Sequence, residues 1–408
     1  MNQERIYELH AGWHNNELIG KLIIGSDRKQ DVFAFAYNDR WLENHPDFLL
    51  DPDIFPFPGR QYAPNGLFSF LEDASPDRWG RELLKRREQN EADKEGRVPK
   101  ELTAQDFLLG VEDSIRMGGI RISDGNGYVA NKNTKIPPTT SLRALEDSAH
   151  KFEKAGAILQ DTELQSLISV GSSLGGARPK VNVIDEKGDL WIAKFQSDRD
   201  QAQTESWEFV THELGILCGL HMAEGRLEQL GNRSCYLTKR FDREKEKRIH
   251  FASAMTMLHK KDGDDASFLE LAECISSISA DAKADLQELW RRIAFGVIVN
   301  NTDCHLRNHG FILTEKGWRL SPAYDINPNP MGKLLAISVD DTHRIPDLGV
   351  VMDTAIYYGI EQPKDEITRM KSIIAKAYIP LAQKVRIPRN EIVQMGRFMG
   401  DDVADKRI

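Results

Sequence analysis

Two short polar segments in the C-terminal half of the chain carry side chains that could catalyse transfer of a group to a hydroxyl. The first runs from Asn301 to Asn308 and contains Asp303, and the second contains Asp325, twenty-two positions after Asp303. A carboxylate can orient an attacking hydroxyl or accept its proton, while an amide oxygen and a second carboxylate are hard oxygen ligands for Mg²⁺. The alternative is two polar loops whose Asx side chains satisfy turn backbones. The combination at this spacing favours catalysis.

An Asp, an Asn five residues on and a second Asp beyond a short hairpin resemble the catalytic and metal-binding loops of protein kinases. Lys194 fits the same pattern, because it lies late in an apolar strand, where a lysine is costly unless it is paired. The next helix bears Glu205, and kinases hold a strand lysine against a helix glutamate. Taken alone, Lys194 is more simply explained as an edge-strand lysine. A phosphate contact is favoured only because Glu205 and the two polar loops occur in the same chain.

A glycine-rich segment, residues 171–180, precedes this strand. It reads Gly-Ser-Ser-Leu-Gly-Gly-Ala-Arg-Pro-Lys, and glycines let backbone N–H groups approach phosphate oxygens. It is not a Walker A loop, because Gly176 is followed by Ala177 rather than by lysine, and it lacks the kinase pattern G-x-G-x-x-G. A phosphate-binding loop and a flexible connector are both open interpretations.

The spacing of apolar residues predicts the elements that position these segments. We expect a β-hairpin from 181–184 and 190–195, a helix over 204–218, a second hairpin around 231–232 and a strand at 310–313. Four more helices are expected at 265–280, 284–299, 364–380 and 389–399.

The front half of the chain is expected to be strand-rich with one helix. Strands are predicted at 22–25 and 32–37, and a helix over 77–87, with Ser75 as its cap and Pro76 in its first turn. The ten charges within 86–101 predict a solvated linker or mobile loop, and 124–141 is a second weak segment.

Composition sets the class of protein. The chain has 408 residues, 40% of them hydrophobic and 29% charged, which suits two or three packed units at roughly 100 to 200 residues each. No apolar run approaches the ~20 residues that a bilayer requires, and the first residues do not resemble a signal peptide, so we expect a cytoplasmic protein without membrane contact. A net charge of −9 has the wrong sign for holding nucleic acid by the overall field.

The four cysteines are widely scattered, and their spacing predicts buried thiols rather than a zinc site or a disulfide framework. They are Cys218, Cys235, Cys274 and Cys304.

Several motifs occur in a fixed order along nearly the whole chain. They are Phe70 to Gly80, Arg116 to Gly118, Ser173 to Lys180, the strand with Lys194, Lys239 to Arg243, the Asp303 to Asn308 loop, and Tyr324-Asp325. Together these motifs resemble the HipA family, the serine/threonine kinase toxins of bacterial type II toxin-antitoxin pairs.

The resemblance implies a role for each catalytic position. It makes Asp303 the catalytic base, Asn308 and Asp325 the magnesium ligands, and Lys194 the phosphate contact, with Glu205 as its helix partner. ATP and Mg²⁺ would be used together. His305 and Tyr324 would lie beside the phosphates.

The resemblance also assigns the nucleotide-binding positions. The residues lining the nucleotide would be Gly175, Gly176, Ala177, Arg178, Pro179 and Lys180, and the adenine hinge would be Lys239, Arg240 and Phe241. Ser173 would be phosphorylated by the kinase itself, with Ser172 as the less favoured acceptor. Lys239 stands where the best-known members carry an acidic residue, but a hinge acts through its backbone, so we expect this change to be tolerated. The segment Gly-Gly-Ala-Arg-Pro-Lys is also more basic than the corresponding loop of the best-known members, and this difference affects the expected nucleotide affinity and rate of autophosphorylation.

We therefore expect an α+β fold of the two-lobed, protein-kinase-like (HipA-like) type, with a strand-rich N-terminal subdomain and a mainly helical C-terminal lobe. The expected boundaries are 1–105 for the subdomain, 106–241 for the kinase N-lobe with the glycine-rich loop and the lysine, and 242–408 for the helical lobe. The enzyme would phosphorylate a host protein, such as a translation factor or an aminoacyl-tRNA synthetase. A helix-turn-helix (HipB-like) antitoxin would neutralise it and carry its contact with operator DNA.

Two alternatives remain. A small-molecule phosphotransferase would keep Asp303, Asn308 and Asp325, but the match over residues 66–80 argues against it. A catalytically silent, nucleotide-binding co-repressor is disfavoured, because every expected catalytic group is present.

Overall fold

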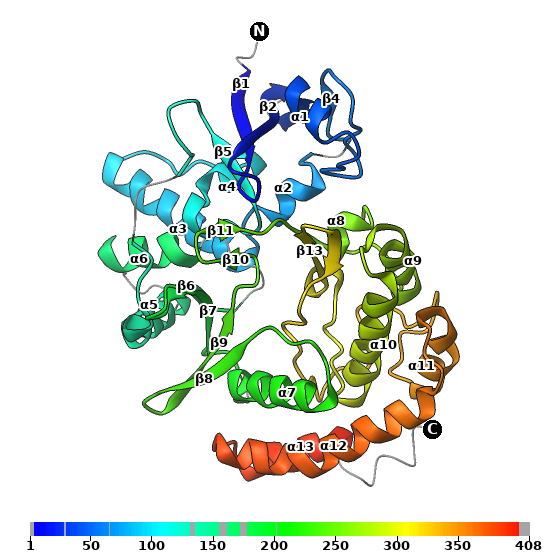
Figure 1. The fold of residues 1–408 in the computed structure, drawn as a ribbon. Coiled ribbons are helices and arrows are strands. Elements are labelled where there is room, and N and C mark those ends of the chain that lie inside the picture. Colours follow the sequence, from blue (N-terminus) through cyan, green and yellow to red (C-terminus); the bar gives the residue numbers. More distant parts are fainter. Residues whose placement is uncertain are drawn as a thin grey trace. The chain divides into compact units, whose positions relative to one another are not determined.

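The computed structural model describes residues 4–27, 30–64, 66–130, 135–154, 161–171, 178–200 and 202–399 (Figure 1). The chain divides into a first unit, residues 1–198 with 242–252, and a second unit, residues 199–241 with 253–408. Both units combine helices with antiparallel strands, which confirms the α+β class. The three-part division with boundaries at 105 and 241 stays a prediction.

A five-stranded antiparallel sheet forms the N-terminal part of the first unit, with strand order β4-β3-β2-β1-β5. Its strands are β1 (Arg5–Ala11), β2 (Glu17–Asp27), β3 (Gln30–Tyr37), β4 (Gln61–Tyr62) and β5 (Ile120–Ser123). Leu22 lies opposite Phe35 on the neighbouring strand, and both side chains are fully buried in one apolar core. The strands predicted at 22–25 and 32–37 are thus confirmed, each inside a longer strand.

Helices are more numerous in the first unit than the sequence predicted. They are α1 (Asp39–Asn44), α2 (Ser69–Asp73), α3 (Arg78–Glu95), α4 (Ala104–Gly110), α5 (Leu142–Glu153) and α6 (Asp161–Gly171). The prediction of a front half with one helix is wrong. Three of the missed helices, α1, α2 and α4, have only five to seven residues, so they give little periodic signal and form through tertiary burial.

The charged segment 86–101 is not a linker, because helix α3 continues through it to Glu95. Its buried stripe includes Leu83, Leu84 and Ala92, and the helix ends at Gly96, whose φ of 65° is a left-handed C-cap. The N-cap is Asp77 rather than the predicted Ser75, and its carboxylate accepts the N–H of Arg78. A one-sided apolar stripe is enough to pack a helix whose other face is mostly charged.

The hairpin that carries Lys194 also belongs to the first unit. Its strands are β6 (Lys180–Ile184) and β7 (Leu190–Phe195), as predicted, and a shorter antiparallel pair is formed by β10 (Arg243–Glu244) and β11 (Lys247–Arg248). The strand β12 (Phe251–Ser253) lies where the sequence passes into the second unit.

The second unit is mainly helical. Its helices are α7 (Thr204–Cys218), α8 (Ala254–Met257), α9 (Phe268–Ile278), α10 (Ala282–Ile298), α11 (Leu348–Thr354), α12 (Pro363–Lys384) and α13 (Arg389–Met399). Two hairpins accompany them, β8 (Gly225–Leu230) with β9 (Arg233–Lys239), and β13 (Gly310–Thr314) with β14 (Gly317–Leu320). The helices and hairpins predicted for this part of the chain are confirmed within a few residues.

Helix α10 lies at the centre of the second unit, beside α9 and α11 (Figure 1). Trp290 is fully buried, and its indole N–H donates to the main-chain oxygen of Val351 at 2.9 Å.

All four cysteines are free thiols, and two of them, Cys218 and Cys235, are buried. Within the described ranges, no helix has both the length and the apolar character needed to cross a membrane.

Candidate functional site

Helix α10 leads directly into the loop that contains Asp303. Two residues after the helix, Asn300 has a left-handed backbone (φ 54°), which turns the chain sharply. The Asn300 side-chain amide donates to the main-chain oxygens of Asn329 at 2.6 Å and Gly332 at 3.2 Å. These hydrogen bonds fix the path of the chain just before Asp303, whose side chain is exposed to solvent.

Hydrogen bonds within the loop from Asp303 to Asn308 hold it in one shape. The N–H of His305 donates to the main-chain oxygen of Asp303 at 3.1 Å, and the N–H of Asn308 donates to the main-chain oxygen of His305 at 2.8 Å. The side-chain amide of Asn308 also donates to the Asp303 oxygen, at 3.1 Å. Because the amide nitrogen is used in this way, Oδ1 of Asn308 is the atom able to coordinate a cation.

A second loop, which carries Asp325, is joined to the first. The hydroxyl of Tyr324 donates to the main-chain oxygen of Arg307 at 2.7 Å, so the neighbours of Asp325 and Asn308 are in direct contact. Asp325 has a φ of 55°, an uncommon conformation for a non-glycine residue that concentrates at functional sites. The side-chain amide of Asn327 donates to Asp325 Oδ1 at 3.2 Å. The structure thus brings the two predicted loops together.

Helix α10 also holds the strand that leads to Asp325. The Asp285 carboxylate accepts from the guanidinium of Arg319 at 2.9 and 3.0 Å, and from the N–H of Leu320 at 2.9 Å. Burial raises the pKa of Asp285, but the bonds from Arg319, Ser279 and Leu320 outweigh it and keep that pKa below its usual value. Two turns further along α10, the guanidinium of Arg292 donates to the main-chain oxygen of Ser321 at 2.8 Å. One helix therefore positions both loops.

The two loops concentrate negative charge. Burial raises the pKa of the Cys304 thiol to about 12, and the carboxylates of Asp303 and Asp325 add to this rise. Burial likewise raises the pKa of Tyr236, and the carboxylates of Glu208 and Asp325 contribute. Carboxylate and amide oxygens are hard donors that suit Mg²⁺, and Asn308 and Asp325 are the residues able to hold it.

The predicted hinge residues lie near these loops. The ring of Phe241 is 5.4 Å from the ring of Tyr324, centroid to centroid. Arg240 is buried, whereas Lys239 is half-buried, and its Nζ lies 3.5 Å from Glu224 Oε2. The main-chain N–H of Lys239 donates to the main-chain oxygen of Glu224 at 2.7 Å. This N–H is therefore already used in pairing at the end of the β8–β9 hairpin.

Two buried lysines lie side by side on one face of the β6–β7 hairpin in the first unit. Lys180 on β6 is the register partner of Lys194 on β7, and residues directly opposite in an antiparallel pair lie on the same face. Their exposed fractions are 8% and 9%. Pro179, just before them, accepts the N–H of Phe195 at 2.9 Å, and Arg178 is exposed. Two buried cations on one face suit an anionic ligand.

Glu205 lies in the first turn of α7 and is buried, with only 3% of its surface exposed. It belongs to the second unit and Lys194 to the first, so their pairing stays a prediction. The predicted nucleotide-binding residues Gly175, Gly176 and Ala177 and the predicted phosphorylation sites Ser172 and Ser173 lie outside the described residues.

Two buried residues near the loops, Glu208 and His309, were missed by the sequence analysis. Glu208 lies one turn after Glu205 on α7 and is also buried, so helical spacing could have indicated it. His309 Nε2 lies 3.0 Å from Cys304 Sγ, and burial, together with the charges of Arg292 and His305, lowers the pKa of His309 to about 3. No local sequence signal predicts that this histidine remains neutral.

Family models match most of the chain. A model described as the HipA-like C-terminal domain matches residues 172–390, which is more than half of the chain, and one described as the HipA N-terminal domain matches residues 12–98. The α+β fold and the sequence together define a member of the HipA family, to which this chain belongs.

Individual relatives are distant. The "Putative kinase Y4dM" of Sinorhizobium fredii is 23% identical over 48% of this chain, which spans about half of that relative (55%). The "Serine/threonine-protein kinase toxin HipA" of Shewanella oneidensis is 23% identical over 88% of this chain and 86% of its own length. A solved structure of Shewanella oneidensis HipA with HipB and its operator DNA covers 96% of this chain and 95% of its own, with a TM-score of 0.66 and 17% identity. This likeness confirms the HipA-like fold.

Proposed function

We propose that this chain is a serine/threonine protein kinase that uses ATP and Mg²⁺. The observation that carries the proposal is the contact between the two loops, in which the Tyr324 hydroxyl binds the main-chain oxygen of Arg307. This contact joins the loop that carries the exposed Asp303 to the loop that carries Asp325, which supports a shared site with Asn308 and Asp325 as proposed oxygen ligands. Kinase names among the relatives support the same class of reaction.

In the proposed reaction, Asp303 orients the acceptor hydroxyl and takes its proton as the oxygen attacks the γ-phosphorus of ATP. The bond from that phosphorus to the bridging oxygen breaks, ADP leaves, and a phosphoester of the acceptor remains. Bound Mg²⁺ would supply charge neutralisation for the phosphates. Asn308 and Asp325 would hold that ion, and the hydrogen bonds of Asn308 and Asn327 keep the two loops in place.

Further residues are proposed to hold the nucleotide. Lys180 and Lys194 supply buried positive charge for the phosphates, and Glu205 is the proposed partner of Lys194. His305 would lie beside the phosphates, as would Tyr324. The glycine-rich segment that ends in Arg178, Pro179 and Lys180 would close on the nucleotide, and Arg240 and Phe241 would contact the adenine. Ser173 in that segment is the proposed site of autophosphorylation.

A helix-turn-helix antitoxin is the proposed partner. The Shewanella oneidensis relative of the same fold was solved with HipB and operator DNA, which supports a similar assembly for this chain. The net charge of −9 favours DNA contact mainly through the partner rather than through this chain itself. The proposed substrate is a host protein, such as a translation factor.

Two carboxylate variants test the kinase proposal. Asp303→Asn should bind Mg-ATP nearly as the wild type does but lose phosphotransfer by about 10²- to 10⁴-fold, because only the base is removed. Asp325→Asn should weaken binding of Mg-ATP as well. Titration calorimetry and a phosphotransfer assay separate the two effects, and Asp353→Asn, at an exposed position on α11, is the control. Wild-type phosphotransfer by Asp303→Asn would refute the assignment.

A growth experiment separates the kinase from the co-repressor. Production of the chain without its partner should slow growth, and Asp303→Asn should relieve this effect, because the harm comes from phosphorylation of a host protein. Equal inhibition by both forms would favour binding without catalysis. Phosphorylation of a metabolite but of no protein would favour the small-molecule enzyme.

A further inference from the structure

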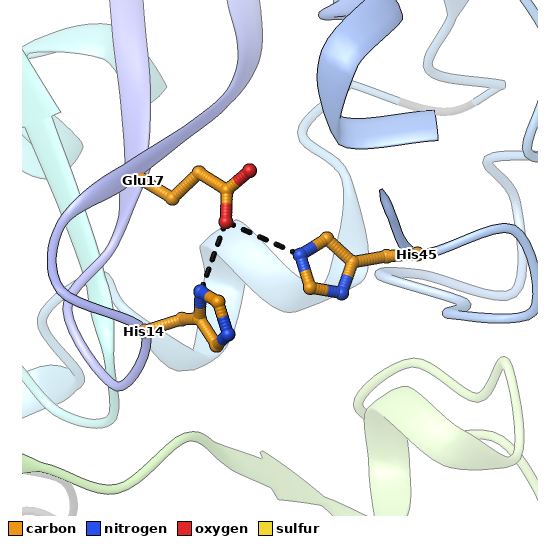
Figure 2. A group of neighbouring side chains, drawn as sticks. All are labelled: His14, Glu17 and His45. Atoms are coloured by element: carbon orange, nitrogen blue, oxygen red, sulfur yellow. Dashed lines mark hydrogen bonds and ion pairs between the residues drawn. The ribbon is translucent and has the colours of Figure 1, made fainter. Parts of the chain in front are cut away.

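Three side chains able to ligate a metal meet in the first unit, on segments that the proposed kinase chemistry does not use. Glu17 Oε2 lies 2.9 Å from His14 Nδ1 and 3.2 Å from His45 Nε2. One potential ligand atom from each of the three residues lies within 4.8 Å of the other two. Figure 2 shows both imidazole rings directed at the same carboxylate oxygen. His45 follows His14 by thirty-one positions, so only the fold brings them together.

The turn between β1 and β2 sets the positions of His14 and Glu17. Asn15 and Asn16 have left-handed backbones, with φ of 50° and 58°, a conformation that asparagine adopts more readily than most residues. The N–H of Glu17 donates to the main-chain oxygen of His14 at 2.9 Å, which closes the turn. The two ligands are therefore fixed relative to each other by main-chain bonds.

The end of helix α1 sets the position of His45. This residue is the C-cap of the helix, and its N–H donates to the main-chain oxygen of Trp41 at 2.8 Å. Its ring lies 4.1 Å from the ring of Trp41, which is buried in the core of the sheet. The imidazole is thus held against a rigid neighbour rather than free to turn toward solvent.

The separations suit a metal ion. Zinc binds histidine nitrogen and carboxylate oxygen at about 2.0 to 2.2 Å, so two ligands of a tetrahedral ion lie about 3.3 Å apart. The distance of 3.2 Å between His45 Nε2 and Glu17 Oε2 is close to that value, and the distance of 2.9 Å between His14 Nδ1 and Glu17 Oε2 would need to lengthen by a few tenths of an ångström. The other carboxylate oxygen, Oε1, accepts the side-chain amide of Asn44 at 3.1 Å, a support typical of the groups that orient metal ligands.

The cluster is open to solvent on one side. A cavity of about 610 Å³ lies beside it, lined by His14, Glu17, Leu18, Asn38, Arg40 and Asn44. The His14 side chain is 51% exposed, whereas those of Glu17 and His45 are each 22% exposed. An ion could therefore enter from the cavity and keep one position there for water, and the nearby Arg40 would favour an anionic group at that position over a second cation.

We propose that His14, Glu17 and His45 form a binding site for one divalent transition-metal ion of the zinc class, with water as the fourth ligand. The ion would join the β1–β2 turn to the end of α1. Two histidines and one carboxylate with an open position are a ligand set that zinc uses in proteins. The site is independent of the proposed kinase reaction.

Metal titration of the complete, tag-free chain after treatment with a chelator tests the site. Zn²⁺ should bind with one equivalent per chain by calorimetry, and Co²⁺ in its place should give the visible absorption of a site with nitrogen and oxygen ligands. His14→Gln and Glu17→Gln should each weaken Zn²⁺ affinity by about tenfold or more, and Asn44→Ala by roughly 10- to 100-fold. His343→Gln is the control, because His343 lies 2.6 Å from Asp340 in a pair without a third ligand of this kind among the described residues.

The outcomes are decisive. If the wild-type chain shows no saturable equivalent of Zn²⁺, or if His14→Gln and Glu17→Gln bind it as the wild type does, the site does not exist. Circular dichroism of each variant checks the fold. Should Glu17→Gln fail to fold, His14→Gln still decides, because that side chain is half-exposed and its removal leaves the sheet intact. An equal loss of affinity in His343→Gln would also overturn the proposal.

Discussion

The side-chain amide of Asn308 donates a hydrogen bond to the main-chain oxygen of Asp303, with 3.1 Å between Nδ2 and O. The bond closes the loop on itself, so a proposed metal ligand also fixes the backbone of the proposed catalytic base. Positioning and ligation therefore reside in two ends of one amide group, and substitutions can separate them.

Replacement of Asn308 by two different residues should divide these roles. Asn308→Asp keeps an oxygen ligand but loses the N–H donor, so Mg-ATP affinity should stay within a few-fold while turnover falls by about 10²-fold through misplacement of Asp303. Asn308→Ala should lose both affinity and turnover. Equilibrium binding and steady-state rates measured at several Mg²⁺ concentrations check this. Equal losses in both variants would contradict the positioning role.

Tyr324→Phe removes only the hydroxyl that joins the two loops, and it leaves the ring beside Phe241. We expect a loss of about 1 kcal/mol in the free energy of unfolding, as for one hydrogen bond, and a clear fall in turnover. Urea denaturation and phosphotransfer rates give the two values. Tyr357→Phe, at an exposed position, should change neither. Full activity in Tyr324→Phe would show that the contact does not support catalysis.

Gly332→Ala should disturb the start of the loop from Asp303 to Asn308. A Cβ at this position would overlap the Thr302 side chain, and Thr302 directly precedes Asp303. We expect a loss of about 1 to 3 kcal/mol in stability, as for overpacking, together with reduced phosphotransfer. Gly127→Ala is the matched control, since a Cβ there meets no atom within 4 Å. The thermal unfolding midpoint of each variant is the measurement, and equal midpoints would contradict the expected overlap.

The Asp285 carboxylate should make stability depend on pH. Its pKa in the folded chain lies below the usual value, so its contribution is present above pH of about 4 and is lost as the pH falls through the folded-state pKa. Asp285→Asn should therefore lose about 2 kcal/mol of unfolding free energy at pH 7, because the charged hydrogen bonds to Arg319 are broken. Near pH 3 the difference from the wild type should shrink. Urea unfolding at both pH values checks this, and a constant difference would refute it.

The sequence determined the segments whose signals are local. Helix α10, the β13–β14 hairpin and the loop between them were predicted, because apolar spacing and turn residues report on neighbours in the chain. The identities of Asp303, Asn308 and Asp325 were also read from spacing alone, and their roles stay predictions.

Tertiary contacts decided what local pattern could not. The stretch 86–101 carries ten charges, yet most of it is helical, because the buried stripe of α3 packs against the rest of the first unit. Asn300 and Thr302 position the loop that contains Asp303 through hydrogen bonds with Asn329, about thirty residues away. The pattern of neighbouring residues carries no information about hydrogen bonds between such distant positions.

The His14, Glu17 and His45 cluster makes the same distinction. The spacing of His14 and Glu17 is visible in the sequence, but a third ligand thirty-one positions after His14 is not, because its place depends on how α1 packs on the sheet. Stereochemistry within a few residues fixes turns, strands and helices, and so the sequence alone could determine them. Which side chains then meet depends on burial of apolar surface between distant segments, and only the tertiary structure decides that.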